Sequence, residues 1–279
     1  MRTDLTPPPA AAPGAAARPA LLPVLIGFGI DVLIAVGLLL TLSVAGFAIW
    51  GAIRGVGYVQ AAKAQGLTPS SAEVMAAVGQ PGVMVQLLTA LVSTATPAVL
   101  LYFWRRRATA GEQASSRAAA RRASTWGWTA LIAVTVFLLS NLVSVAASAL
   151  GIKPVPTNLP LMEEAIKHWP LALALFAVVI APAYEELLFR RVLFGRLLAA
   201  GRPWLGIVLS GALFALVHEV PGVSGNGPAA IAQLWLVYGS MGAAFAWLYW
   251  RTGTLWAPIA AHGINNATAL AALYFFGIG

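Results

Sequence analysis

Long runs of hydrophobic residues, separated by short polar or proline-containing stretches, form the main pattern of this chain. Each run is close to the roughly 20 residues that an α-helix needs to cross the hydrocarbon core of a bilayer. The pattern therefore predicts an all-α polytopic transmembrane bundle of about seven spans. The predicted spans are 21–50, 82–104, 126–150, 170–200, 204–220, 229–250 and 255–276.

The stretches between these runs carry signals for short elements. Residues 67–73 combine a Ser/Thr start with an acidic first turn, which predicts a short helix at the membrane surface. Residues 108–124 are rich in Ala, Ser and Arg and read as a solvated loop, with contact to lipid headgroups as the functional alternative. A short amphipathic piece is expected near residues 162–168, with His168 at the interface.

Composition supports a membrane protein and excludes several other classes. The 279 residues are 59% hydrophobic and 9% charged, whereas soluble domains carry about 25% charged residues. There is no cysteine, so disulfides and thiolate metal sites are excluded. The net charge of +8 comes from basic residues in short loops rather than from one basic stripe, so nucleic-acid binding is not expected.

Residues 1–20 are rich in Pro and Ala, which predicts a disordered tail before a single transmembrane domain, residues 21–279. Alternate loops carry 13 and 4 basic residues, and this bias predicts a cytoplasmic N-terminus in a bacterial cell membrane. Asp31 lies inside the first span, where we expect it to make a local hydrogen bond or to face the bundle.

The fourth predicted span contains adjacent carboxylates and two arginines inside an apolar helix. Ionisable groups at such depth are costly and usually functional. Glu186 and Arg190 are four residues apart, so they share a helical face and can form an ion pair. Glu185 points about 100° away and has no partner on its own helix. We therefore expect a structural Glu186–Arg190 pair and a Glu185 that is free for chemistry.

The fifth and seventh spans place further polar groups at matching depth. Glu185 and His218 lie 16 and 17 residues from the turn at Gly201, about 24–26 Å along each helix of an antiparallel hairpin. Phe214 and His218 share a face at four-residue spacing. On the seventh span, His262 and Asn266 are also four residues apart, while the neighbouring amide, Asn265, lies on the flank.

Each of these residues alone has an ordinary structural explanation. A buried His or Asn commonly makes an interhelical hydrogen bond, and an Arg–Glu pair can serve packing specificity. Two histidines, an unpaired carboxylate and an amide in one buried layer favour instead a site that hydrolyses with water or conducts ions.

Three motifs in order resemble the CPBP family of intramembrane proteases, also called Abi or CAAX proteases. They are Glu-Glu-x-x-x-Arg at 185–190, Phe-x-x-x-His at 214–218 and His-x-x-x-Asn at 262–266. The resemblance covers roughly residues 170–275, which would be the catalytic core. The chain departs at Arg191, where many members have Gly.

The resemblance implies an endopeptidase acting on a membrane-associated protein or peptide, with or without a lipid anchor. It implies that Glu185 and His218 activate the attacking water, and that His262 and Asn266 stabilise the oxyanion. Glu186, Arg190 and Phe214 would support them. These are the groups that peptide hydrolysis needs.

The sequence leaves metal participation and the class of function open. Glu185, His218 and His262 would suffice for a catalytic zinc, but no His-Glu-x-x-His helix is present, and we expect that no cofactor is required. Two other functions compete with proteolysis: a non-catalytic membrane scaffold or immunity-type protein of the same fold, and a small proton-relaying transporter. No inverted repeat supports the transporter.

Overall fold

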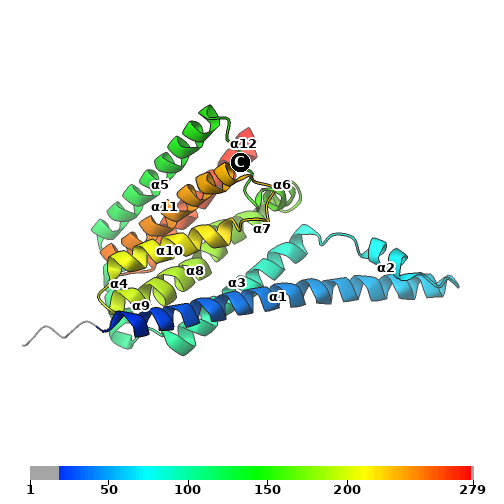
Figure 1. Ribbon diagram of the computed structural model, residues 1–279, viewed down its shortest axis with the longest axis horizontal. Coiled ribbons are helices and arrows are strands. Elements are labelled where there is room, and N and C mark those ends of the chain that lie inside the picture. The colour runs from blue at the N-terminus through cyan, green and yellow to red at the C-terminus, as the bar shows by residue number, and fades with distance from the viewer. Residues whose placement is uncertain (1–18, 278–279) are drawn as a thin grey trace, which may run out of the picture.

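The computed structural model describes residues 19–277, and every regular element in this part of the chain is helical (Figure 1). The predicted tail, residues 1–20, lies almost entirely outside the described residues. The elements are α1 (Leu21–Ala64), α2 (Ser71–Val78), α3 (Val83–Arg105), α4 (Ala110–Ala120), α5 (Ala123–Ala149), α6 (Leu159–His168), α7 (Pro170–Leu175), η1 (Phe176–Ile180), α8 (Ala181–Glu186), η2 (Leu187–Phe194), α9 (Gly195–Ala199), α10 (Pro203–His218), α11 (Pro228–Thr252) and α12 (Trp256–Phe276).

The predicted polytopic helical bundle is confirmed. Five helices of the described chain are long and apolar enough to cross a membrane: α1, α3, α5, the continuous segment Pro170–Ala199 and α11. The other two predicted spans are α10, which has 16 residues, and α12, whose hydropathy is lowered by His262, Asn265 and Asn266. Both helices carry predicted site residues, as does the 170–199 segment.

The fourth predicted span is one helical segment with two π-helical stretches, η1 and η2, on either side of α8. In a π-helix the hydrogen bond runs to the fifth residue, so the helix is wider and its side chains shift in phase. Such stretches are rare and often occur at functional sites. Glu185 and Glu186 lie on the α-helical turn between them.

A close crossing of α10 and α11 anchors the second half of the bundle. A Cβ added at Gly211 would lie 2.8 Å from the carbonyl oxygen of Gly239, and one at Gly242 would lie 2.8 Å from Cβ of Phe214. The two glycines therefore let the helix backbones approach each other, as small residues do in membrane bundles. The turn before α10 ends at Gly201 with a positive φ of 71°, and Pro203 begins the helix as predicted.

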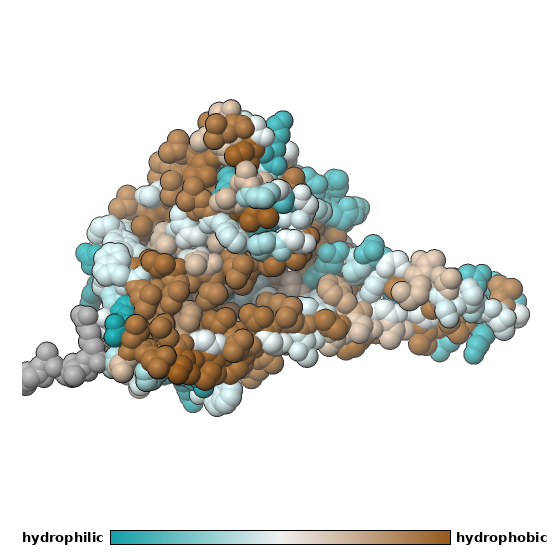
Figure 2. Space-filling model, viewed as in Figure 1, coloured by the Kyte–Doolittle hydropathy of each residue, from teal (hydrophilic) through white to brown (hydrophobic). Residues whose placement is uncertain are grey.

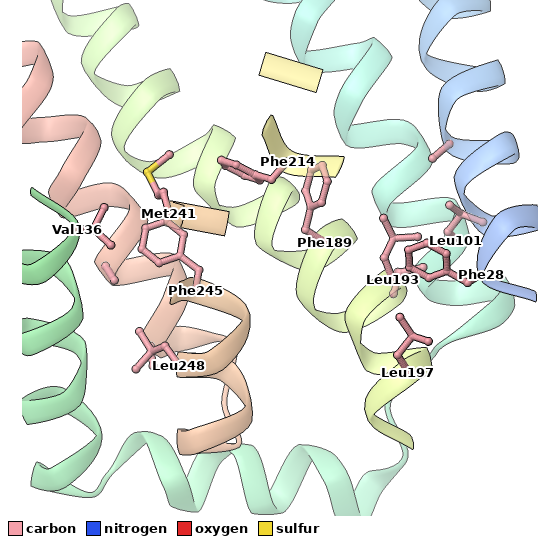
Figure 3. Close-up of a cluster of buried hydrophobic side chains, with 14 of the residues drawn as sticks. Phe28, Leu101, Val136, Phe189, Leu193, Leu197, Phe214, Met241, Phe245 and Leu248 are labelled. Atoms are coloured by element: carbon pink, nitrogen blue, oxygen red, sulfur yellow. The ribbon is translucent and has the colours of Figure 1, made fainter. Parts of the chain in front are cut away.

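The largest apolar cluster joins α1, α3, the 170–199 segment, α10 and α11 (Figure 3). Phe189, Phe214 and Phe245 lie at its centre, and all three are almost fully buried. Large apolar side chains also cover much of the outer surface, for example Leu33 at 73% exposure and Leu142 at 66%. Figure 2 shows hydrophobic residues over much of the visible face of the bundle, as expected for lipid contact.

Two predictions from the sequence were wrong: the end of the first helix and the loop at residues 108–124. The first helix does not end at residue 50 but continues to Ala64, because no proline or glycine turn interrupts it before Gly66, whose φ is 74°. The added part projects beyond the bundle, and α2 folds back on it (Figure 1). Residues 110–120 form a helix rather than a loop, because Thr109 and Glu112 make a capping box.

Asp31 faces the bundle and pairs with two arginines. Its buried carboxylate forms an ion pair with Arg105 at the end of α3 and with Arg196 on α9, where the guanidinium Nη2 lies 2.6 Å from Oδ2. The pairs tie α1 to two other helices. A local hydrogen bond, the other expectation for Asp31, is not what holds it.

We expect Asp31→Ala to destabilise the protein by about 1–3 kcal/mol. Removing one partner of a fully buried pair costs about 3–5 kcal/mol, and the cost is smaller here because the arginines are 24% and 21% exposed. Thermal unfolding in detergent micelles measures the change. The control is Glu164→Ala, which removes an exposed ion pair with His168 and should leave the unfolding temperature unchanged. An equal effect of both variants would contradict the role of Asp31.

The helix α4 is held against the bundle by Arg191, the residue that departs from the family pattern. Its guanidinium donates two hydrogen bonds to the Glu112 carboxylate, at 3.0 and 2.8 Å. A third bond, of 3.1 Å, goes to the carbonyl of Arg106. The hydrogen bonds from Arg191, together with the backbone of Thr109, lower the pKa of Glu112 from 4.5 to about 2.

This shift predicts that α4 loosens in acid. Because the folded-state pKa of Glu112 is lowered, its contribution to stability is complete above pH 4.5 and is lost as the pH falls towards 2. A fluorophore on Ser115→Cys, in α4, should gain mobility over that range. In a Glu112→Gln background the mobility should be high already at neutral pH and should not change over the same range. A pH-independent signal in the parent protein would refute the coupling.

Candidate active site

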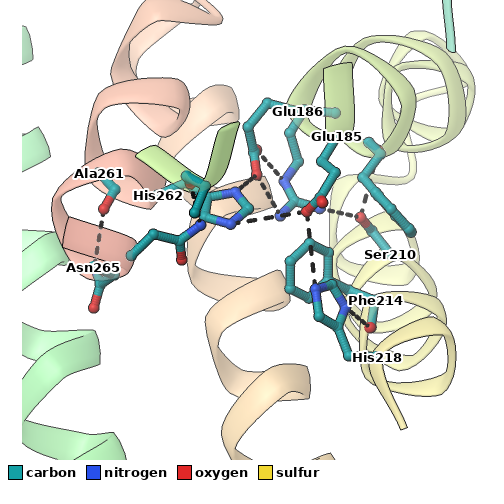
Figure 4. Close-up of polar contacts among 12 residues, drawn as sticks. Glu185, Glu186, Ser210, Phe214, His218, Ala261, His262 and Asn265 are labelled. Atoms are coloured by element: carbon teal, nitrogen blue, oxygen red, sulfur yellow. Dashed lines mark hydrogen bonds and ion pairs between the residues drawn. The ribbon is translucent and has the colours of Figure 1, made fainter. Parts of the chain in front are cut away.

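Three side chains from three separate elements meet in the interior of the bundle (Figure 4). Oε2 of Glu185, on α8, lies 3.9 Å from Nε2 of His218 at the end of α10. The same oxygen lies 3.8 Å from Nε2 of His262 on α12. The structure therefore places one carboxylate oxygen between two imidazole nitrogens. The depth match between Glu185 and His218 expected from the hairpin is present in the structure.

The side chains of the site are partly exposed, while its central oxygen is buried and has no hydrogen-bond partner in the described chain. The side chains of Glu185 and His218 are 21% and 22% exposed, whereas that of His262 is 3% exposed. Oε2 of Glu185 makes no hydrogen bond within the described chain. Polar atoms 3.8–3.9 Å apart are too far for a direct hydrogen bond, and that separation suits a bridging water.

The orientation of His218 follows from its own helix. Its Nδ1 lies 2.7 Å from the carbonyl oxygen of Phe214, one turn earlier. A carbonyl can only accept, so Nδ1 carries the proton and, in the neutral ring, Nε2 is an acceptor that points to Glu185. The ring also packs on Phe214 and Tyr238, with centroids 4.2 and 4.8 Å away. Phe214 thus supports His218 through both its backbone and its ring.

His262 is held by the neighbouring carboxylate. Its Nδ1 lies 3.0 Å from Oε1 of Glu186, and its ring stacks on Phe245 at 5.3 Å. The approach of α12 depends on Gly263, where an added Cβ would lie 2.6 Å from the carbonyl oxygen of Val178 in η1. The Glu186–His262 contact was not predicted, because helical spacing reports partners only within one helix.

Glu186 and Arg190 form the ion pair that their spacing predicts. Nε of Arg190 lies 2.7 Å from Oε2 of Glu186, and both side chains are fully buried. Arg190 also donates a 3.1 Å hydrogen bond to Ser210 of α10. Its guanidinium lies over the rings of Phe214 and Phe245, 5.1 and 5.7 Å from their centroids. Ser210 was not singled out from the sequence, although it lies one turn before Phe214 on the same face of an apolar helix.

The two amides of α12 face different neighbours. Asn266 donates a 2.8 Å hydrogen bond from Nδ2 to the carbonyl of Ala177 in η1. Asn265 donates to the carbonyls of Ala261 and Ala133, at 2.9 and 3.4 Å. Asn266 is therefore the amide that packs against the segment carrying Glu185, and Asn265 faces α5.

Glu219 is a further buried carboxylate that sequence reasoning missed. It follows His218 directly and accepts hydrogen bonds from Thr157 at 2.7 Å, from Asn226 at 3.0 Å and from Ser224. Burial raises the pKa of Glu219, and the three side-chain hydrogen bonds outweigh this and lower the pKa below its ordinary value. The signal in the sequence was a carboxylate next to the motif histidine.

Glu185, His218 and His262 carry the donor atoms that zinc takes. No group of three or more His, Cys, Asp or Glu side chains within residues 19–277 has an arrangement that would hold a metal ion. The described residues therefore do not form a preformed zinc site in this structure.

We expect Glu186→Ala to lower stability strongly, by about 3–5 kcal/mol, because it leaves Arg190 buried without its partner. The double variant Glu186→Leu with Arg190→Met removes both charges and should recover most of the loss. Thermal unfolding in lipid nanodiscs compares the two. If the double variant were less stable than the single one, the ion-pair argument would be wrong.

Comparisons with known proteins agree with the motifs. Residues 167–268 match the family described as "Type II CAAX prenyl endopeptidase Rce1-like". Over 116 residues the chain is 32% identical to the "Putative membrane peptidase YdiL" of Bacillus subtilis (strain 168). The aligned residues cover 42% of this chain and 43% of that relative. The chain thus spans less than half the length of the curated relative it matches. No solved structure matches the chain.

The matched region includes the parts of α8, α10 and α12 that meet at the polar site. It contains all three motifs, and with them Glu185, His218, His262 and Asn266. The resemblance to CAAX-type intramembrane proteases that the three motifs indicate is therefore confirmed for residues 167–268 of this integral membrane protein.

Proposed function

We propose that this protein is an intramembrane endopeptidase that hydrolyses a peptide bond in a membrane-associated protein or peptide. The observation that carries the proposal is the free carboxylate oxygen of Glu185, which lies within 4 Å of Nε2 of both His218 and His262. A carboxylate and an imidazole acceptor at that separation can together bind and polarise one water molecule.

In the proposed reaction, the water lies between Glu185 and Nε2 of His218. Glu185 takes a proton from the water, and the water oxygen attacks the carbonyl carbon of the scissile bond. The carbonyl π electrons move to the oxygen and form a tetrahedral oxyanion. The same proton then passes from Glu185 to the amide nitrogen as the carbon–nitrogen bond breaks. The products are a carboxylic acid and an amine, so atoms and charge balance.

His262 and Asn266 are proposed to stabilise the oxyanion. Nδ1–H of His262 donates to Glu186, so a donor at Nε2 requires the doubly protonated ring. Its charge and that of Arg190 would face the two carboxylates of Glu185 and Glu186. The amide of Asn266 has two N–H groups. One of them binds the carbonyl of Ala177, and the other is available to the substrate. Removing one such donor typically costs about 100- to 1,000-fold in rate.

The remaining parts of the proposal concern surroundings and cofactors. We propose that the mechanism requires no metal. We also propose that the protein lies in a bacterial cell membrane with its N-terminus in the cytoplasm, an orientation that the asymmetry of basic residues supports. Lipidation of the substrate is an analogy to the family description alone, because no residue of the site has a chemistry that recognises a prenyl group.

Cleavage by the purified protein in lipid tests this function. We expect Glu185→Gln and His218→Ala to reduce the cleavage of a pool of membrane-tethered peptides by at least 100-fold without loss of folding. The matched control is His168→Ala, because His168 is an exposed histidine at a surface helix end and its loss should leave turnover unchanged. Full turnover by Glu185→Gln would refute the assignment of the base.

A parallel reaction with a chelator separates the two hydrolytic mechanisms. Retained cleavage with the chelator, combined with loss in Glu185→Gln, supports the metal-independent mechanism. Loss of cleavage both with the chelator and in Glu185→Gln would support a zinc mechanism instead. Absence of cleavage by the folded wild-type protein in every arm would favour the non-catalytic scaffold.

A further inference from the structure

The two ends of the bundle differ in chemistry. The first, which we call the arginine end, contains the end of α3, α4, the end of α9, the start of α10 and the end of α11 (Figure 1). Its basic residues in the described chain are Arg105, Arg106, Arg107, Arg117, Arg121, Arg122, Arg191, Arg196, Arg202 and Arg251. The opposite end, which we call the α6 end, consists of α6 and the loops 151–158 and 219–227.

Aromatic side chains mark the membrane boundary at the arginine end. Trp204 at the start of α10 and Trp250 at the end of α11 pack edge to face, with centroids 5.4 Å apart. Trp204 is 65% exposed. Tryptophans of this kind gather where the hydrocarbon core meets the headgroups, so this pair gives a level from which depth can be measured.

Measured from that level, His218 lies close to the other end. It is fourteen residues beyond Trp204, about 21 Å along α10. The next residue, Glu219, accepts a 2.8 Å hydrogen bond at its carbonyl from Trp235. Trp235 is seven residues into α11, about 10 Å from its start at the α6 end. His262 is six residues beyond Trp256, about 9 Å along α12, and its imidazole faces the same Glu185 oxygen as His218.

Packing around the site is tight on the arginine side and loose on the other. Eight of the twelve residues 186–197 are buried, but only four of the sixteen residues 170–185. On α12, five of the eight residues 256–263 are buried, against one of the thirteen residues 264–276. In both elements the change occurs at the polar layer. The core around Phe189, Phe214 and Phe245 packs tightly on the arginine side of this layer.

The exposure of the site residues follows the same direction. Glu185 and His218 are 21% and 22% exposed, His262 is 3% exposed, and Glu186 and Arg190 on the arginine side are fully buried. The two more exposed site residues therefore adjoin the half that contains residues 170–184 and 264–276.

We propose that the site opens towards the α6 end and accepts peptide segments presented on that face of the membrane. This inference rests on the proposed endopeptidase function and adds the class of substrate. Because the arginine-rich end is the cytoplasmic one under the positive-inside rule, the substrate is a segment on the extracytoplasmic side, such as the exported part of a membrane-anchored polypeptide.

Thiol labelling tests the route of access without any need for activity. The chain has no cysteine, so single-cysteine variants report one position each. Glu185→Cys should react with a small, charged, membrane-impermeant thiosulfonate from the same side as Val223→Cys, which lies in the loop 219–227 and is 69% exposed. It should react at least tenfold more slowly from the side that labels Ser115→Cys of α4. The buried control, Ala261→Cys, should remain unlabelled from both sides.

Reaction of Glu185→Cys from the Ser115 side, or from neither side, would overturn the proposed route. Intact bacterial cells provide the assignment of the faces, because the reagent should label Val223→Cys there and not Ser115→Cys. The reverse result would overturn the extracytoplasmic assignment of the substrate.

Wild-type protein in vesicles sorted by orientation then tests the substrate class. A lipid-anchored peptide added to the outer leaflet alone should be cleaved at least tenfold faster when the α6 end faces outwards. Faster cleavage with the arginine end outwards would overturn the inference and leave the proposed protease function standing. Absence of cleavage in both orientations, together with the expected labelling, would refute the protease function and leave the route of access standing.

Discussion

The buried charge of Glu186 is the constraint on which the site depends. Its carboxylate faces Arg190 on one side and His262 on the other, so a single group connects the 170–199 segment with α12. An isolated charge in this environment would be very costly. The pair is tolerable because Arg190 also binds Ser210 and lies over aromatic rings, which stabilise a desolvated guanidinium. The same contacts orient the imidazole that faces Glu185.

Such short distances between polar groups require the helices to come unusually close. Gly263 permits contact between α12 and the backbone of η1. Gly211 and Gly242 permit the crossing of α10 and α11, across which Tyr238 of α11 packs on His218. In a bilayer, lipid competes with apolar side chains, so close backbone packing and polar contacts take the place of hydrophobic burial. The chemistry of the site and the packing of the bundle therefore have the same physical origin.

The sequence predicts those parts of the structure that follow from one helix or one hairpin. Hydropathy predicts the spans, four-residue spacing predicts the Glu186–Arg190 pair, and equal distances from the turn at Gly201 predict that Glu185 and His218 meet. Contacts between helices far apart in the chain, such as Asp31 with Arg196 or His262 with Glu186, cannot be derived from spacing. The π-helical stretches depend on tertiary packing and were likewise out of reach.

The difference in packing on the two sides of the polar layer has a mechanical consequence for catalysis. Hydrolysis needs donors and a base held within a few tenths of an ångström, and this precision comes from rigid neighbours. The tight half supplies it through Arg190 and the phenylalanine core. A peptide substrate, in contrast, must enter and leave, which requires a side with few buried contacts. Glu219 lies at that boundary and ties the loops 151–158 and 219–227 to the end of α10 through Thr157 and Asn226. The looser side is thus anchored next to His218, so in the proposed mechanism a substrate could enter without moving this imidazole.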